Sequence, residues 1–71
     1  MKSVVIKDEF IKLGQALKLA GVVDSGLEAK IVIQDGKVKV DGSIEEHRGR
    51  KLYDGMVVEY GGDTFKIHSS N

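Results

Sequence analysis

The chain contains no cysteine, so neither a disulfide framework nor a thiolate zinc site can stabilise it. That absence is typical of a protein from a reducing compartment. No run of about 18 apolar residues occurs, which predicts that no helix spans a membrane. The apolar stretch at the N-terminus, Val4–Ile6, is too short for a signal peptide. We therefore expect a cytoplasmic protein with no membrane partner.

Motifs for catalysis are also missing. There is no glycine-rich phosphate loop of the kinase or dinucleotide type. The only histidines are His47 and His68, and neither has a neighbouring cysteine or a motif partner for metal binding or nucleophilic catalysis. No paired-carboxylate site is visible either. We expect a protein that is not an enzyme and has no cofactor, metal or small-molecule substrate.

The net charge is zero, which gives no general attraction to nucleic acid or to acidic lipid. The charges are nevertheless unevenly distributed. Residues 37–52 carry five cations and three carboxylates, whereas residues 53–71 carry one cation and three carboxylates. A neutral total therefore conceals a polarised molecule.

The densest run of one charge is His47–Leu52, which contains Arg48, Arg50 and Lys51. Gly49 lets the backbone bend there, so neighbouring cations could converge on one anion. A solvated loop is the alternative interpretation of such a run.

The N-terminal part predicts a strand and then a helix. Ser3–Lys7 is apolar and β-branched at its centre, which indicates a short strand with partial cover on both faces. Asp8–Ala20 begins with two carboxylates and predicts a helix that ends at the following glycine. Its expected buried stripe has helical spacing and comprises Phe10, Leu13, Leu17 and Ala20. Lys12, Gln15 and Lys18 fall on the opposite side, where solubility is the plainest role for the two lysines.

A second helix is predicted to begin at Ser25 and to end at Gly36. Ser25 and Glu28 have capping-box spacing, in which the hydroxyl accepts from the Glu28 amide and the carboxylate accepts from the Ser25 amide. The first amides of this helix could instead hold a phosphate. One apolar stripe comprises Ala29, Val32 and Ile33, and a second comprises Leu27 and Ile31. Two apolar sides predict a helix sandwiched between the first helix and a sheet.

After the second helix the apolar period changes to two, which predicts strands. Val38 and Val40 share one face, and Asp41-Gly42 predicts a hairpin turn. A two-residue turn would place Ile44 on the opposite, lysine-bearing face. A three-residue turn, Asp41–Ser43 with a bulge at the glycine, would place it with the valines, and we favour this second form.

Another hairpin is predicted from Met56–Tyr60 and Asp63–Ile67, joined by two glycines. In that register Val58 faces Phe65 across the strands. Residues 68–71 are expected to form a frayed tail.

Four segments in this order resemble an S4-type RNA-binding domain: Leu13–Ala20, Ser25–Lys30, Gly36–Gly42 and Arg48–Leu52. Within that group the chain is similar to the small stand-alone YaaA-like proteins of bacteria. The resemblance covers roughly residues 9–60. It implies one α+β domain over residues 1–71 with an S4-like (alpha-L) fold, in which two packed helices lie against a small, mainly antiparallel sheet.

The resemblance also implies that the two helices and the following loop bind structured RNA, commonly ribosomal RNA or a ribosome assembly intermediate. Ribosomal proteins are further candidate partners. The implied contacts are Lys12, Gln15, Lys18, Ser25, Gly26, Lys30, Arg48, Arg50 and Lys51. Arginine forks suit phosphate oxygens, and lysines add mobile point charge. The chain departs from the family at Asp41, where asparagine is usual, and at His47, where a second arginine is frequent.

Aromatic residues make up 6% of the chain, and Phe10 and Phe65 have the pattern of core residues. With so few rings for base stacking, we expect recognition of the RNA backbone and shape rather than of sequence. Tyr53 is the one candidate for stacking, and packing in the core or at its rim is the alternative interpretation.

A rival hypothesis is a small protein-interaction module whose basic run docks on an acidic partner. A β-grasp sulfur carrier, suggested by Gly61-Gly62, is set aside because nine residues follow Gly62 and such a carrier needs a terminal glycine carboxylate.

Overall fold

The computed structural model describes all 71 residues. It contains seven strands and two helices. The strands are β1 (Lys2–Ile6), β2 (Phe10–Lys12), β3 (Val38–Val40), β4 (Ser43–Ile44), β5 (Lys51–Tyr53), β6 (Val57–Tyr60) and β7 (Asp63–Ser69). The helices are α1 (Leu13–Leu19) and α2 (Gly26–Gln34). Neither helix has the length and apolar character needed to cross a membrane.

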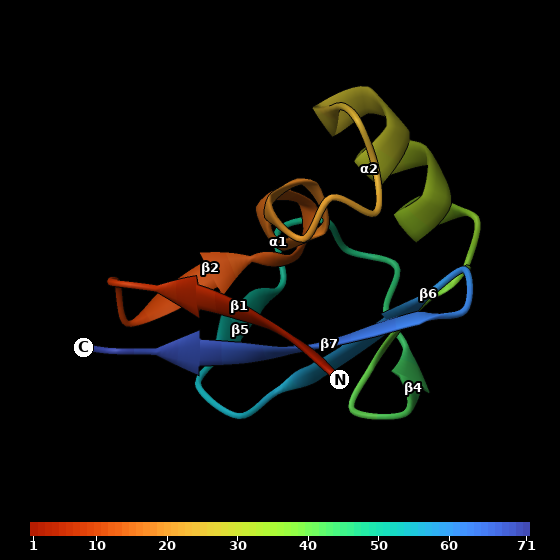
Figure 1. Cartoon of the computed structure of the whole chain (residues 1–71). Helices are drawn as coiled ribbons and strands as arrows, with labels where there is room; N and C mark the ends of the chain where they lie inside the picture. The colour runs from red at the N-terminus through yellow and green to blue at the C-terminus, as the bar shows by residue number, and fades with distance from the viewer.

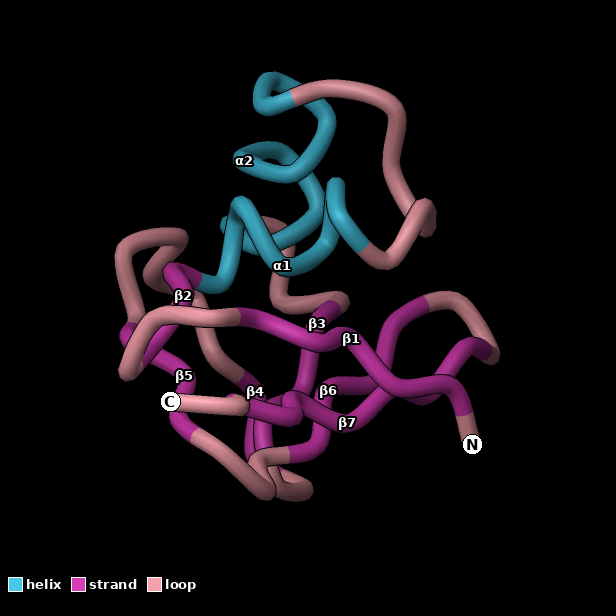
Figure 2. Tube along the Cα trace, turned by 60° about the vertical axis from the view of Figure 1, so that its left-hand side comes forward, coloured by secondary structure: helices cyan, strands magenta, loops and turns pink.

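Five strands form one mixed sheet in the order β1-β7-β6-β3-β4, and β2 pairs with β5 in a separate two-stranded ribbon. Only the β1–β7 pair is parallel. Both helices lie on the same side of the sheet, with α1 nearer to it than α2 (Figures 1 and 2). The expected α+β architecture, two packed helices against a mainly antiparallel sheet, is confirmed.

The core consists of 16 buried residues, all of them apolar. Leu13 and Leu17 of α1 belong to this core together with Ile33 of α2 and the sheet residues Val58 and Phe65, and all five are at most 1% exposed. Val58 pairs with Phe65 across β6 and β7, as the sequence predicts. Truncation of a fully buried aromatic such as Phe65 to alanine costs about 3–5 kcal/mol, so this contact anchors the fold.

The first helix is shorter than predicted. The chain over Phe10–Lys12 is a strand, and the helix begins only at Leu13. The reason is a long-range contact, because β2 pairs antiparallel with β5 and the Leu13 amide donates to the Arg50 carbonyl at 2.9 Å. Phe10 is therefore a half-buried strand residue rather than part of the helical stripe. The chain does leave the helix at a glycine, Gly21, with φ of 77°.

The second helix is not sandwiched. Ala29, Val32 and Ile33 are buried as predicted, but Leu27 and Ile31 on the far side are 68% and 49% exposed. The α1 helix occupies the position between α2 and the sheet, so only one face of α2 finds a partner. The N-terminal cap forms, with the Glu28 amide donating to the Ser25 hydroxyl at 3.1 Å. The Glu28 carboxylate, however, accepts from the Asp24 amide at 2.7 Å instead of the Ser25 amide.

The first hairpin has the shorter of the two turns considered. Val40 pairs with Ser43 and Lys39 with Ile44, which leaves a two-residue turn at Asp41-Gly42. Both turn residues have positive φ, 50° and 86°, as a tight hairpin that matches strand twist requires. Ile44 consequently lies on the lysine face and is 59% exposed, so the favoured three-residue turn was wrong.

The two chain ends are tied together by strand pairing. His68 pairs with Val5 and Ser69 with Ile6 in the parallel β1–β7 ladder, and the Ser70 amide donates to the Ile6 carbonyl at 3.0 Å. The expected frayed tail is therefore wrong for these residues. The expectation for the first strand was also wrong in part, because Val5 is 61% exposed and only one face of β1 is covered.

Candidate nucleic-acid interface

A groove of about 310 Å³ lies where α1, the start of α2 and the loop before β5 meet. Its lining has three cations, no carboxylate and no hydrophobic residue: Lys12, Gly14, Gln15, Lys18, Gly26, Arg48 and Gly49. Five of the nine predicted contact residues are in that set, from three segments distant in the sequence. The structure therefore brings Lys12, Gln15, Lys18, Gly26 and Arg48 together around one hollow.

The cations of the groove have no carboxylate partner. The structure contains three ion pairs, and they involve only Arg50, His47 and His68 as the basic member. Lys12, Lys18 and Arg48 are thus available to a ligand. Unneutralised cations that line one concave surface raise the local concentration of anions and attract phosphate.

Backbone hydrogen bonds fix the basic loop against the first helix. The amides of Leu13 and Gly14 donate to the carbonyls of Arg50 and Arg48 at 2.9 and 3.0 Å. The first amides of a helix have no hydrogen-bond partner within the helix. Here the carbonyls of the loop accept from them, and no side chain caps the helix. A Cβ on Gly14 would lie 3.6 Å from the Cβ of Arg48, so the two segments are in close contact. The position of Arg48 is therefore set by the start of α1.

Comparison with known proteins places the chain in a family. A family model for the S4 domain matches residues 4–68, nearly the whole chain. The chain belongs to the S4 domain family. The resemblance found in the sequence is thereby confirmed, and the fold is the S4-like alpha-L fold.

Two bacterial relatives of this S4 domain match most of its length. YbcJ of Escherichia coli strain K12 is 38% identical over 61 residues, which cover 86% of this chain and 87% of YbcJ; its name refers to RNA binding. RlbA of Bacillus subtilis strain 168, named a probable ribosome maturation protein, is 49% identical over 57 residues, which cover 80% of each chain.

Two solved structures share the fold. The solution structure of YbcJ, described as an alpha-L motif involved in RNA binding, aligns with a TM-score of 0.75 at 34% identity over 97% of this chain and 89% of YbcJ. The ribosomal protein S4e of Thermoplasma acidophilum aligns with a TM-score of 0.64 at 26% identity, over 84% of this chain and 32% of S4e.

Glu45 organises the basic loop of this S4 domain, and the sequence analysis missed it. Its carboxylate accepts from the Arg50 guanidinium at 2.6 Å and from the His47 amide at 3.2 Å, and lies 2.9 Å from Nδ1 of His47. The side chain of Glu45 is only 13% exposed. The hydrogen bond from the His47 side chain, together with Arg50, lowers the pKa of Glu45 although burial opposes this. In the sequence, the signal for this role is that Glu45 precedes His47 by two residues and Arg50 by five.

The four remaining predicted contact residues lie outside the groove. Arg50 is bound to Glu45, and Lys51 has its ammonium 4.8 Å from the centre of the Phe10 ring. Ser25 caps α2 and precedes Gly26 at the groove, and Lys30 follows one helical turn later. The cations of the basic run therefore do not converge on one point, and only Arg48 lines the groove.

The residues at which the sequence departs from the family have local roles. Asp41 accepts a hydrogen bond from the Val57 amide at 2.9 Å, which ties the β3–β4 turn to β6. Asp41 does not line the groove, so its charge is not among the groove cations. His47 is bound to Glu45 and is likewise absent from the groove.

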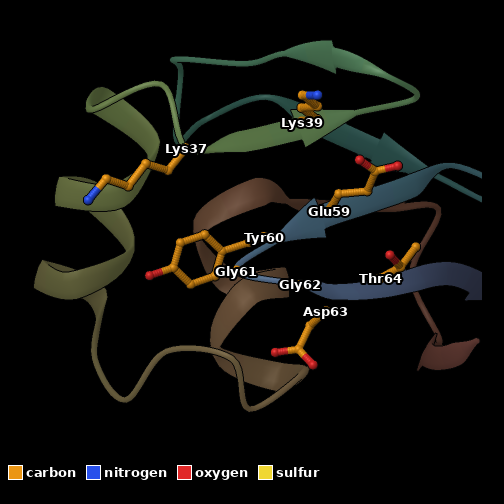
Figure 3. A pocket seen from close by; sticks show the side chains of 8 residues that line it. All are labelled: Lys37, Lys39, Glu59, Tyr60, Gly61, Gly62, Asp63 and Thr64. Atoms are coloured by element: carbon orange, nitrogen blue, oxygen red, sulfur yellow. The ribbon is translucent and has the colours of Figure 1, made fainter.

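A second hollow, of about 210 Å³, lies at the β6–β7 turn and has a different character. Figure 3 shows Lys37 and Lys39 there together with Glu59 and Asp63, around the turn at Gly61-Gly62. Its two cations are balanced by two carboxylates. This balance removes the net attraction for an anion that the groove has.

Proposed function

We propose that this chain binds structured RNA through the groove, with ribosomal RNA or a ribosome assembly intermediate as its target. The observation that carries the proposal is the unbalanced charge of the groove, where Lys12, Lys18 and Arg48 have no carboxylate among them. Phosphate is the RNA group that such a lining selects, and Arg48 can contact two phosphate oxygens at once.

The recognition is of backbone and shape. The α1 helix has seven residues and is about 10 Å long, so the groove accommodates a short piece of RNA backbone. Gln15 and the first amides of α2 supply neutral hydrogen-bonding groups for phosphate oxygens or 2′-hydroxyls. Neutralisation of three phosphates predicts a slope of log affinity against log salt of about −2 to −3.

Membership in the S4 domain family supports RNA as the ligand, and so does the name of the relative YbcJ, which refers to RNA binding. The ribosomal part of the proposal draws on RlbA, which is named for ribosome maturation.

The ribosomal target is tested by sedimentation of a cell lysate on a sucrose gradient at low and at raised salt, with the protein detected in each fraction. We expect co-migration with a ribosomal subunit or its precursor at low salt and release at raised salt, because the contacts are electrostatic. A protein found only at the top of the gradient at both salts contradicts the ribosomal target.

The groove is tested with matched variants of equal net charge. Replacement of Lys12, Lys18 and Arg48 by alanine should abolish co-migration. Replacement of three exposed lysines elsewhere, Lys37, Lys39 and Lys66, should leave it in place. Equal loss in both variants would mean that total charge matters and the groove does not.

The rival hypothesis, an acidic protein partner, uses the same cations and has the same dependence on salt. Treatment of a pull-down with ribonuclease separates the two. Partners that remain bound to the protein after the RNA is digested would contradict RNA as the ligand.

A further inference from the structure

A hollow continues from the groove along β2 toward a pair of aromatic rings. It has a volume of about 440 Å³, shares Lys12 and Gln15 with the groove, and reaches Phe10. Its lining also carries the carboxylates Asp8 and Glu9, which precede Phe10, so this hollow favours a phosphate only beside Lys12.

The outer face of this ribbon combines two rings with two cations. Phe10 pairs directly with Tyr53, and Lys12 with Lys51, so these four side chains share one face. The other face carries Leu52, which is fully buried, and so it is turned toward the core. Aromatic rings on a solvent-facing strand pair beside two lysines are the elements of a stacking surface for single-stranded nucleic acid.

Tyr53 is the ring that remains open to a ligand. Its centroid is 5.9 Å from that of Phe10 with the planes at 50°, an arrangement in which Phe10 supports the side of Tyr53. The ammonium of Lys51 is already placed over the Phe10 ring at 4.8 Å. Tyr53 is 43% exposed, which excludes the core position considered from the sequence.

Two carboxylates lie at the end of the ribbon that carries Phe10 and Tyr53. Glu9 precedes Phe10 and Asp54 follows Tyr53, and the two line a common hollow with the tyrosine. Phosphates are repelled at that end and attracted at the end with Lys12 and Lys51. The charge pattern thus directs a phosphate to the lysines and leaves the uncharged base on the ring.

We propose that Tyr53 stacks on an unpaired RNA base whose phosphate lies between Lys12 and Lys51, so that the protein prefers structured RNA that carries a bulged nucleotide beside a helix. This inference rests on the proposed function of the groove. It adds a preference for a local RNA structure, which phosphate contacts alone do not provide.

The test compares two hairpin RNAs at low salt, one fully paired and one with a single bulged 2-aminopurine. We expect the wild-type protein to bind the bulged hairpin about tenfold more tightly, because stacking of one base on an aromatic ring has an effect of this order. The fluorescence of the bulged 2-aminopurine should fall on binding, since stacking quenches it.

Variants of Tyr53 assign the preference to the ring. Tyr53→Leu should remove the preference and the quenching while leaving affinity for the paired hairpin unchanged, and Tyr53→Phe should keep both. Equal wild-type affinity for the two hairpins overturns the inference, as does an equal loss on both hairpins in Tyr53→Leu. A thermal melt checks that the leucine variant is folded.

A control separates this inference from the proposed function. Arg48→Ala should weaken binding of both hairpins, whatever Tyr53 does. If the wild-type protein binds neither hairpin, the proposed function fails and the inference fails with it. If both hairpins bind equally and Arg48→Ala weakens both, only the stacking inference fails.

Discussion

The groove at α1 and the hollow at the β6–β7 turn are both small and lysine-bearing, yet only one of them suits an anion. In the groove, three cations have no carboxylate among them. At the turn, Glu59 and Asp63 balance Lys37 and Lys39. The difference shows that the sum of charges lining a hollow is a better guide to anion binding than the number of its lysines or its volume.

The largest effect is expected from reversal of one charge in each region. Arg48→Glu removes a guanidinium and places a carboxylate beside Lys12 and Lys18, so RNA affinity should fall by about 100-fold or more. Lys39→Glu makes the same change of net charge at the turn hollow and should alter affinity by less than about threefold. Titration of a labelled hairpin RNA measures both. Similar losses in the two variants would erase the distinction between the regions.

Glycines have different roles in the two regions, and substitutions should separate them. Gly62 has φ of 84°, so Gly62→Ala should strain the turn and lower the free energy of unfolding by about 1–2 kcal/mol, with RNA affinity unchanged. At Gly26, φ is not positive and an added Cβ meets no atom within 4 Å. Gly26→Ala should preserve stability and weaken RNA binding a few-fold, because the methyl group enters the groove. Denaturant unfolding and RNA titration of both variants give the two readouts, and a stability loss in Gly26→Ala would contradict this assignment.

Glu45→Gln tests whether the Glu45 carboxylate stabilises the basic loop that carries Arg48. Loss of the ionised partner of Arg50 and His47 should lower the free energy of unfolding by about 1 kcal/mol at neutral pH, since Arg50 is itself half-exposed and screened.

The same variant has a signature in its pH dependence. Because the pKa of Glu45 in the folded protein is below its ordinary value of 4.5, its contribution is fully present above that value. The contribution is lost as the pH falls through the lowered pKa. Melting temperatures of wild type and Glu45→Gln should therefore converge as the pH falls below 4.5. A difference in melting temperature that persists at acidic pH would mean that the carboxylate charge is not what stabilises the loop.

The smallest effect is expected from an attempt to convert the turn hollow. Glu59→Gln with Asp63→Asn removes the two carboxylates and leaves Lys37 and Lys39 unbalanced. Affinity for RNA at low salt should rise by about two- to threefold through added non-specific attraction. No gain at all would show that shape, and not charge balance, distinguishes the two hollows.

Short-range patterns in the sequence were reliable where neighbours in the chain decide the structure. The alternation at Val38 and Val40, the cap at Ser25 and the pairing of Val58 with Phe65 each depend on nearby residues, and each is present. The signal for Lys12, Lys18 and Arg48 was weaker, because charge on a helix face has solubility as its ordinary explanation. Family resemblance, not periodicity, selected those residues.

Errors arose where a distant segment competes for the backbone. The β2 strand replaces a predicted helical turn because β5 supplies partners for it and the carbonyls of Arg48 and Arg50 supply the helix cap. The exposed stripe at Leu27 and Ile31 was assigned to the interior, since amphipathic pattern does not tell how many faces of a helix find a partner.

The sequence by itself determined the residue types of the groove, and it predicted two helices, two hairpins and one basic loop. Only the tertiary structure decided which cations act together. Arg50 is bound to Glu45, Lys51 lies over the Phe10 ring on the β2–β5 ribbon, and Arg48 is the one cation of the basic run that joins Lys12 and Lys18 in the groove. The physical reason is that charges interact over a few ångströms in space, and those distances are set by folding rather than by spacing along the chain.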